Sequence, residues 1–225
     1  MSGRPPPGMR TLGTDDVTCR LVLVRHGEPQ AAVLGIVGGP TGDTGLTGVG
    51  RDQVIRLAER LAGSAELAGT SALYASSLPR AIQTAELLAP ALGGLDVQVC
   101  HDLREHDPGE LDGLLWDEAT RRFPLPDFAV EPGRPVAPGG ESLTGFHERA
   151  RSALRDLAER HRHETVVVAC HGGIVAAGVG MVFGIPTRER VFLPTRYASM
   201  TDLELTARGW RLGRYNDRFP LTDQF

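Results

Sequence analysis

The sequence predicts a three-layer α/β/α sandwich with a mostly parallel central sheet. Short apolar runs rich in β-branched residues alternate along the chain with longer stretches whose apolar residues recur at helical spacing. Such runs are typical of strands buried on both faces of a parallel sheet, and their alternation with helices indicates an α/β domain. The chain has 225 residues, of which 41% are apolar, so it is long enough for one domain with a sizeable core.

The first half of the chain contains two strand–helix units. Residues 20–24 (RLVLV) form the first expected strand, and residues 47–61 form the first helix, with the Thr47 hydroxyl as its N-cap. Residues 72–75 form the second strand. A helix over 79–92 begins with proline, which is tolerated there because its missing N–H would be unpaired in the first turn.

A segment crowded with Pro, Gly and charged residues follows a short third strand. The strand covers 97–100, and the segment covers about 102–140, with a short helical pattern over 116–122. We interpret 102–140 as an insertion over the sheet that faces the substrate.

The last third of the chain returns to regular elements. A helix capped by Ser142 covers 142–161, the clearest buried strand covers 165–169, and another helix begins at Gly172. Two strands over 200–205 and 210–214 then complete the sheet at one edge.

The ends of the chain and its apolar runs indicate where the protein resides. Residues 1–18 are rich in Pro, Gly and polar residues and lack the apolar core of a signal peptide, so we expect a flexible leader before a single domain over 19–225. The apolar runs are too short to cross a membrane. We therefore expect a cytoplasmic protein without a membrane partner.

Charge and cysteine content exclude several classes of protein. The net charge is −4 with both signs interspersed, which argues against a polycationic nucleic-acid binder and requires a local basic pocket for any acidic ligand. The three cysteines Cys19, Cys100 and Cys170 lie in or beside apolar segments, so we expect buried thiols and no disulfides. No paired Cys/His spacing indicates zinc.

Strongly polar residues directly follow three of the expected strands, at 25–27, 76–80 and 171–173. Ligands of open α/β sheets bind beyond the carboxyl ends of the strands, so these segments are expected to converge. Together they supply two histidines, two guanidiniums and the N–H groups of Gly-rich turns that open helices. This combination predicts a pocket for a dianionic phosphoryl group.

Six segments in chain order carry a resemblance to one family. They are LVRHGE at 23–28, LTGVGRDQ at 46–53, YASSLPRAIQT at 74–84, LRE at 103–105 followed by Gly109 and Gly113, GGES at 139–142, and VVACHGG at 167–173. From about residue 21 to 205 the chain resembles the histidine phosphatase superfamily, in its phosphoglycerate mutase-like family and phosphatase branch. The resemblance implies a phosphoglycerate mutase-like fold.

The resemblance and the chemistry of these side chains assign the roles. A neutral His26 nitrogen attacks phosphorus and forms a transient phosphohistidine, while Arg25, Arg80 and a protonated His171 depress the pKa of His26. The two guanidiniums and His171 then hold the phosphoryl oxygens. By resemblance Glu105 is the general acid and base.

Three further residues are expected at the phosphate. Gly172 belongs to the second histidine motif and is expected at the phosphate, while Gln30 and Gly39 are further expected contacts in or beside the Gly-rich stretch 35–45. Three more acids of the Glu105 loop remain open alternatives for the proton donor: Asp102, Asp107 and Glu110. Five histidines without a matching motif are interpreted as surface residues: His101, His106, His147, His161 and His163. No metal or other cofactor is expected.

Departures from the family pattern narrow the reaction. Phosphoglycerate mutases carry Asn, Tyr and Asn at positions where this chain has Ala32, Pro108 and Gly173, which disfavours mutase activity. We therefore predict a metal-independent phosphomonoesterase acting on a small phosphorylated metabolite. A mutase-type phosphoryl transferase and a non-catalytic phospholigand-binding protein are the alternatives, and a homodimer is compatible with the resemblance.

The leaving group is left open by the sequence. Five residues of the insertion are expected to face it: Trp116, Arg121, Arg122, Phe123 and Phe128. Sugar phosphates, phosphoglycerate-type acids, an α-ribazole phosphate-like nucleotide and a phosphohistidine protein are all compatible.

Overall fold

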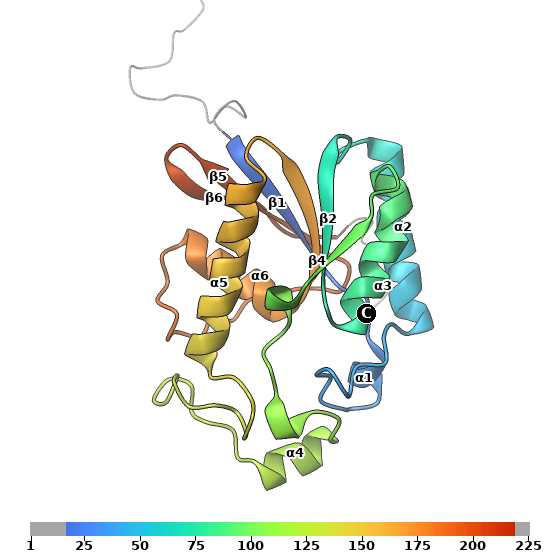
Figure 1. Ribbon diagram of the computed structural model, residues 1–225. Coiled ribbons are helices and arrows are strands. Elements are labelled where there is room, and N and C mark those ends of the chain that lie inside the picture. The colour runs from blue at the N-terminus through green and yellow to red at the C-terminus, as the bar shows by residue number, and fades with distance from the viewer. Residues whose placement is uncertain (1–16, 219–225) are drawn as a thin grey trace, which may run out of the picture.

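Six strands form one sheet in the order β3-β2-β4-β1-β5-β6. The computed structural model describes residues 17–218 (Figure 1). The strands are β1 (Val17–Arg25), β2 (Thr70–Ser76), β3 (Val97–Cys100), β4 (Thr165–Cys170), β5 (Met200–Thr206) and β6 (Gly209–Asp217). The first four strands in the sheet order are parallel, whereas β5 and β6 run antiparallel to their preceding neighbours. The predicted mostly parallel sheet is confirmed.

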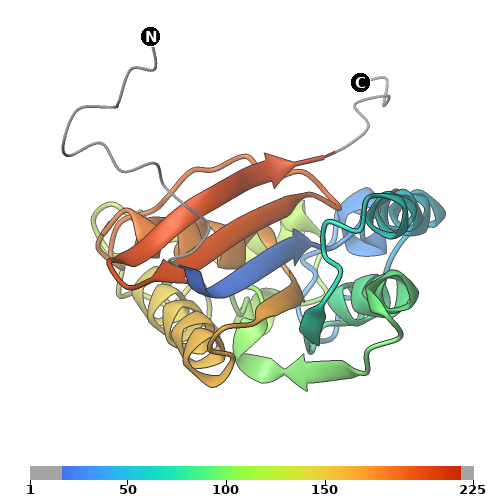
Figure 2. The ribbon, with the colours of Figure 1, turned by 90° about the horizontal axis from the view of Figure 1, so that it is seen from above.

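Helices cover both faces of this sheet, as the view along its edge shows (Figure 2). On one face lie α2 (Gly48–Ser64) and α3 (Pro79–Leu88), and on the other lie α5 (Leu143–Arg160) and α6 (Gly172–Val182). Alternate residues of the buried strands enter two separate apolar cores, one beneath each helical layer. This arrangement is the predicted three-layer sandwich.

Helix termini follow the sequence signals closely, with one exception. Thr47 accepts a hydrogen bond from Gly50 N at 2.9 Å, and Ser142 accepts one from Gly145 N at 3.1 Å, so both predicted N-caps are present. The helix predicted over 79–92 is shorter: α3 ends at Leu88 and a 3₁₀ turn, η2 (Ala89–Leu92), follows. That turn contains Pro90, which has no N–H for an α-helical bond.

The insertion lies beyond the carboxyl ends of the parallel strands, beside the short helix α1 (Gln30–Val33) (Figure 1). It contains η3 (His101–Leu103), η4 (Gly109–Leu111) and α4 (Trp116–Arg122). A small apolar cluster, the insertion core, lies beneath it and consists of Val37, Leu111, Ala119, Val136 and Ala137. Helix α1 was not predicted, because four residues are too few to show a helical period.

The ends of the chain and the cysteines correct two expectations. The leader predicted over 1–18 lies outside the described residues except for its last two, which already belong to β1. Cys19 and Cys170 are buried as predicted, whereas Cys100 is half-buried because it lies on β3, a short strand at the sheet edge. Within residues 17–218, no helix combines the length and the apolar character that a membrane span needs.

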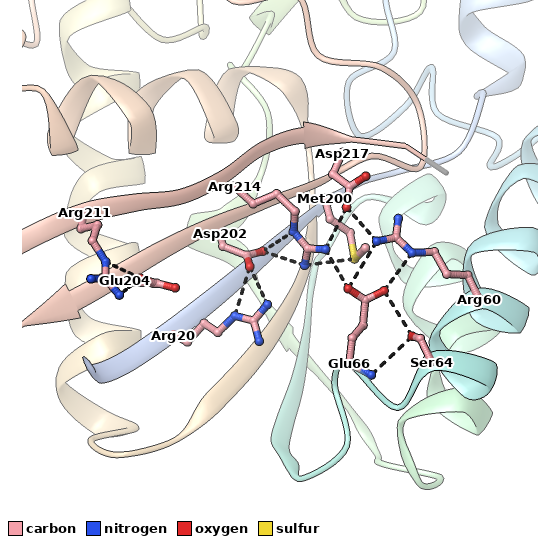
Figure 3. Close-up of polar contacts among 10 residues, drawn as sticks. All are labelled: Arg20, Arg60, Ser64, Glu66, Met200, Asp202, Glu204, Arg211, Arg214 and Asp217. Carbon is pink, nitrogen blue, oxygen red and sulfur yellow. Dashed lines mark hydrogen bonds and ion pairs between the residues drawn. The ribbon is translucent and has the colours of Figure 1, made fainter. Parts of the chain in front are cut away.

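A cluster of ion pairs connects the β5–β6 hairpin to neighbouring segments of the fold (Figure 3). Asp202 in β5 lies opposite Val22 of β1, on the face that α2 covers. Arg214 of β6 contacts Asp202 at 3.1 Å, Glu66 at 2.8 Å and Asp217 at 2.9 Å. Because Glu66 follows α2, this cluster connects the β5–β6 hairpin to the helical layer.

Candidate active site

The strand register brings the three polar segments to one edge of the sheet. Arg25 at the end of β1 lies opposite Cys170 at the end of β4, and Ala75 of β2 lies opposite Ala169 of β4. The residues that follow these strands therefore emerge side by side, although they are far apart in the chain. The rings of His26 and His171 lie 5.2 Å apart between centroids, as the sequence predicted they would converge.

A cavity of about 410 Å³ opens at this edge. Its lining includes four of the predicted catalytic residues: Arg25, His26, Arg80 and Glu105. The opposite wall comes from α1 and the insertion, including Trp116 and Phe128. His171 is fully buried and lies behind His26, outside the cavity lining.

The contacts of His26 fix which ring nitrogen carries a lone pair. Nδ1 lies 2.7 Å from Gly27 O, and because a carbonyl only accepts, Nδ1 carries the proton. Nε2 is then the basic nitrogen, and Arg80 Nε donates to it at 3.2 Å. Burial, followed by the charge of Arg80, holds the pKa of His26 well below its ordinary value. His26 is thus a neutral imidazole with its lone pair beside a guanidinium.

Arg80 is held in place by an acid that the sequence analysis did not single out. Asp43 Oδ2 accepts from Arg80 Nη1 at 2.9 Å and from Arg80 N at 3.2 Å, and the Asp43 side chain is fully buried. Gly38 O accepts from the same Nη1 at 2.8 Å. Asp43 lies in the Gly-rich stretch 35–45, where an acid is typical of a turn, so no signal in the sequence distinguished it.

The second histidine differs from its predicted state. His171 Nε2 lies 2.7 Å from Ser76 Oγ, and Ser76 Oγ also accepts from Leu78 N at 3.2 Å. Burial, together with Arg80, His26 and Arg25, holds the pKa of His171 well below its ordinary value, so this side chain is neutral and the expected protonated form is wrong. Its buried Nδ1 has no hydrogen-bond partner among the described residues.

Arg25 lies between the strand end and the segment that precedes β5. One guanidinium nitrogen donates to Thr195 O, and the guanidinium carbon lies 4.3 Å from the ring centroid of Tyr197. The Tyr197 ring is also 5.7 Å from that of His26 and lines the cavity. Arg25 Nε is buried without a hydrogen-bond partner in the described part of the chain, so it retains donor capacity for a bound anion.

Glu105 is anchored at the N-terminus of α6. Its Oε2 accepts from Gly173 N at 2.9 Å, and its Oε1 accepts from His106 N at 3.0 Å. A Cβ atom at residue 173 would collide with Glu105 Oε1, so a larger residue here would displace the carboxylate from this position. Of the four acids predicted for the role, only Glu105 is among the described residues that line the cavity.

Several predicted contacts lie elsewhere. Gln30 is exposed and donates to Leu46 O at 3.4 Å, while the buried N–H of Gly39 donates to Asp112 at 2.8 Å, and neither lines the cavity. The same holds for three residues of the insertion, namely Arg121, Arg122 and Phe123. Gly172 lies at the first turn of α6, in a neighbouring hollow that shares Glu105 with the cavity.

The interpretation as surface residues is wrong for three histidines. His161 is half-buried, and its Nε2 lies 3.0 Å from Tyr74 Oη. His147 is 3% exposed because its helix packs against α6, and its Nδ1 lies 2.8 Å from Thr187 O. His106 is half-buried, lines the cavity and lies 2.9 Å through Nε2 from Glu141 O. A histidine without a motif gave no indication of these surroundings.

Comparison with known families shows to which family this chain belongs. The family model of the histidine phosphatase superfamily (branch 1) matches residues 21–218. The chain belongs to this superfamily. Several of its relatives and structural neighbours are named as phosphatases, which supports the predicted phosphoric monoester hydrolase.

Two relatives from Arabidopsis thaliana and one solved structure illustrate the similarity. Phosphoglycerate mutase-like protein 4 is 35% identical over 158 residues, which cover 69% of this chain and 67% of that protein. Metal-independent phosphoserine phosphatase is 35% identical over 160 residues, covering 70% and 66%. The chain thus spans about two thirds of the length of these relatives. The mycobacterial glucosyl-3-phosphoglycerate phosphatase superposes with a TM-score of 0.73 at 27% identity, covering 88% of this chain and 98% of that one.

Proposed function

We propose that this histidine phosphatase is a metal-independent phosphomonoesterase that hydrolyses a small phosphorylated metabolite through a phosphohistidine on His26. The observation that carries the proposal is the arrangement at Nε2: Gly27 O fixes the proton on Nδ1, and Arg80 Nε points at the Nε2 lone pair from 3.2 Å. A phosphoryl group that enters between them meets a nucleophile and a guanidinium at once.

In the first half-reaction the His26 Nε2–P bond forms and the bond from phosphorus to the leaving oxygen breaks. The N–H groups of Arg80 and Arg25 now donate charge-assisted hydrogen bonds to the phosphoryl oxygens. Glu105, acting as a carboxylic acid, gives its proton to the leaving oxygen and releases the alcohol. Its position on the cavity lining supports this role.

In the second half-reaction Glu105, now a carboxylate, takes a proton from water. The water oxygen attacks phosphorus, the N–P bond breaks, and inorganic phosphate leaves. The buried Nδ1 of His171 is a further donor for the phosphoryl group if the Ser76 hydroxyl donates to Nε2, an arrangement that the Leu78 N–H bond to Ser76 Oγ supports. His171 acts here as a neutral donor.

The arrangement around Gly173 weighs against the mutase alternative. Family mutases carry Asn at this position, whereas here the Glu105 carboxylate occupies the space that a side chain at residue 173 would need. A non-catalytic phospholigand-binding protein would not require a base with a fixed tautomer beside a guanidinium. Hydrolysis of a phosphomonoester is the reaction that the site supports best.

The proposal is tested with p-nitrophenyl phosphate in excess EDTA. The wild-type protein should hydrolyse p-nitrophenyl phosphate in the presence of EDTA, and His26→Ala should not. His101→Ala, which alters an exposed histidine, should match wild type. Rapid quenching under alkaline conditions, followed by intact mass measurement, should detect a phosphoryl adduct in wild type only. Equal turnover by His26→Ala, or activity lost in EDTA, would contradict the proposal.

A further inference from the structure

The two ends of the cavity differ in chemistry. The inner end carries the cations and the acid described above, around His26. The outer wall is apolar and includes Ile36, Val37, Trp116, Leu125, Phe128 and Val136. Pockets of this kind bind a ligand through apolar contact and orient it through a few polar groups. The wall therefore faces the part of the substrate that leaves.

Part of this wall is exposed although its side chains are large and apolar. Trp116 is 48% exposed and Leu125 is 43% exposed, and both line the cavity. Exposed apolar side chains gathered at a concave site indicate a binding surface, because each remains in contact with water until a ligand covers it. Val37 and Val136 of this wall also belong to the insertion core, so packing within the insertion forms the surface before a ligand arrives.

One arginine of the cavity is not assigned to the phosphate. Arg25 and Arg80 are both needed at the phosphate, and Arg190 is the third arginine among the described residues that line the cavity. The Arg190 guanidinium lies 5.1 Å from the ring centroid of Phe128 and 4.3 Å from that of Phe192. Stacking on these rings leaves the N–H groups in the guanidinium plane able to donate, so Arg190→Ala is the variant that tests for a substrate carboxylate at the rim.

We infer that the preferred substrate carries its phosphate on an apolar, preferably aromatic, alcohol. This inference rests on the proposed phosphomonoesterase function and adds the class of the leaving group. An aromatic leaving group removes Trp116 and Leu125 from water, whereas a phosphoglycerate-type acid places a carboxylate against the same apolar surface.

The test compares three alkyl phosphates: 3-phenylpropyl phosphate, propyl phosphate and 3-phosphoglycerate. The first two release primary alcohols of similar acidity, so their difference in kcat/KM reports contact with the wall and not the reactivity of the leaving group. We expect 3-phenylpropyl phosphate to exceed the other two by about tenfold or more. Trp116→Ala should remove most of that advantage, because it should lower kcat/KM for 3-phenylpropyl phosphate much more than kcat/KM for propyl phosphate. Phe183→Ala, which alters an exposed phenylalanine outside the cavity lining, is the matched control.

Two results would overturn the inference. One is a preference for 3-phosphoglycerate that Arg190→Ala abolishes, because it would show that the rim binds a carboxylate. The other is equal kcat/KM for all three substrates with no effect of Trp116→Ala. Failure of the proposed function has a different signature, since His26→Ala would then leave the turnover of every substrate unchanged.

Discussion

Asp43→Asn tests whether Asp43 positions the Arg80 guanidinium, because the substitution leaves the charge of Arg80 in place. The substitution keeps the volume of the side chain and removes its negative charge. Arg80 and Asp43 have side chains that are 6% and 0% exposed, and their charged atoms lie 2.9 Å apart. Removing one partner of a buried pair costs about 3–5 kcal/mol, because the other charge stays buried without compensation. The asparagine oxygen keeps one acceptor, so we expect the free energy of unfolding to fall by about 3 kcal/mol.

The larger effect is expected on catalysis. Asp43 determines the direction of the Arg80 guanidinium, which in turn faces His26 Nε2. A misplacement of about 1 Å in such a group costs roughly a hundredfold in rate. We expect kcat for p-nitrophenyl phosphate to fall about a hundredfold and KM to change less, because Arg25 still binds the phosphate. Circular dichroism should establish that the variant is folded under the assay conditions.

Asp112→Asn is the matched control, because Asp112 holds the same Gly-rich stretch without contacting Arg80. It accepts backbone N–H bonds from Gly39, Thr41 and Gly42 at 2.8, 2.6 and 2.9 Å. We expect a loss of stability of about 1–3 kcal/mol with kcat within fivefold of wild type. Equal losses of kcat in both variants would refute positioning of Arg80 by Asp43 and assign the effect to the loop. A folded Asp43→Asn with kcat within threefold of wild type would refute it outright.

Three further outcomes follow from the geometry. Gly173→Ala should displace Glu105 and lower kcat by at least about a hundredfold, with His26 phosphorylation slowed in rapid-quench assays; an unchanged kcat would show that Glu105 is not the proton donor. Stability should fall as the pH drops below about 6.5, because buried histidines such as His147 stay neutral in the fold while the unfolded chain takes up protons; urea unfolding should show a slope of up to about 1.4 kcal/mol per pH unit for each, reduced in His147→Gln. Arg214→Met should cost about 2–3 kcal/mol, whereas Arg134→Met, which breaks an exposed pair, should cost under about 0.5 kcal/mol; similar losses would contradict the role of burial.

The order of elements and the motif residues were accessible from the sequence because their signals are local. Apolar periodicity, the caps at Thr47 and Ser142, and proline at the start of α3 each act within a few residues. The two histidines and Arg25 lie at strand ends and Arg80 lies in the helix turn after β2, so parallel strands bring them together. Where a signal was short or interrupted, as at α1 and Pro90, the predicted boundaries were missed or wrong.

The tertiary structure alone decided the partners and protonation states of these residues. Asp43 meets Arg80 across 37 positions, Ser76 meets His171 across 95, and Glu105 reaches the Gly173 amide across 68. No local pattern encodes such contacts. His171 is neutral for the same reason, because desolvation and neighbouring cations depend on everything packed around the ring. The sequence determined which groups reach the site, and packing between distant segments determined how each group is held and charged there.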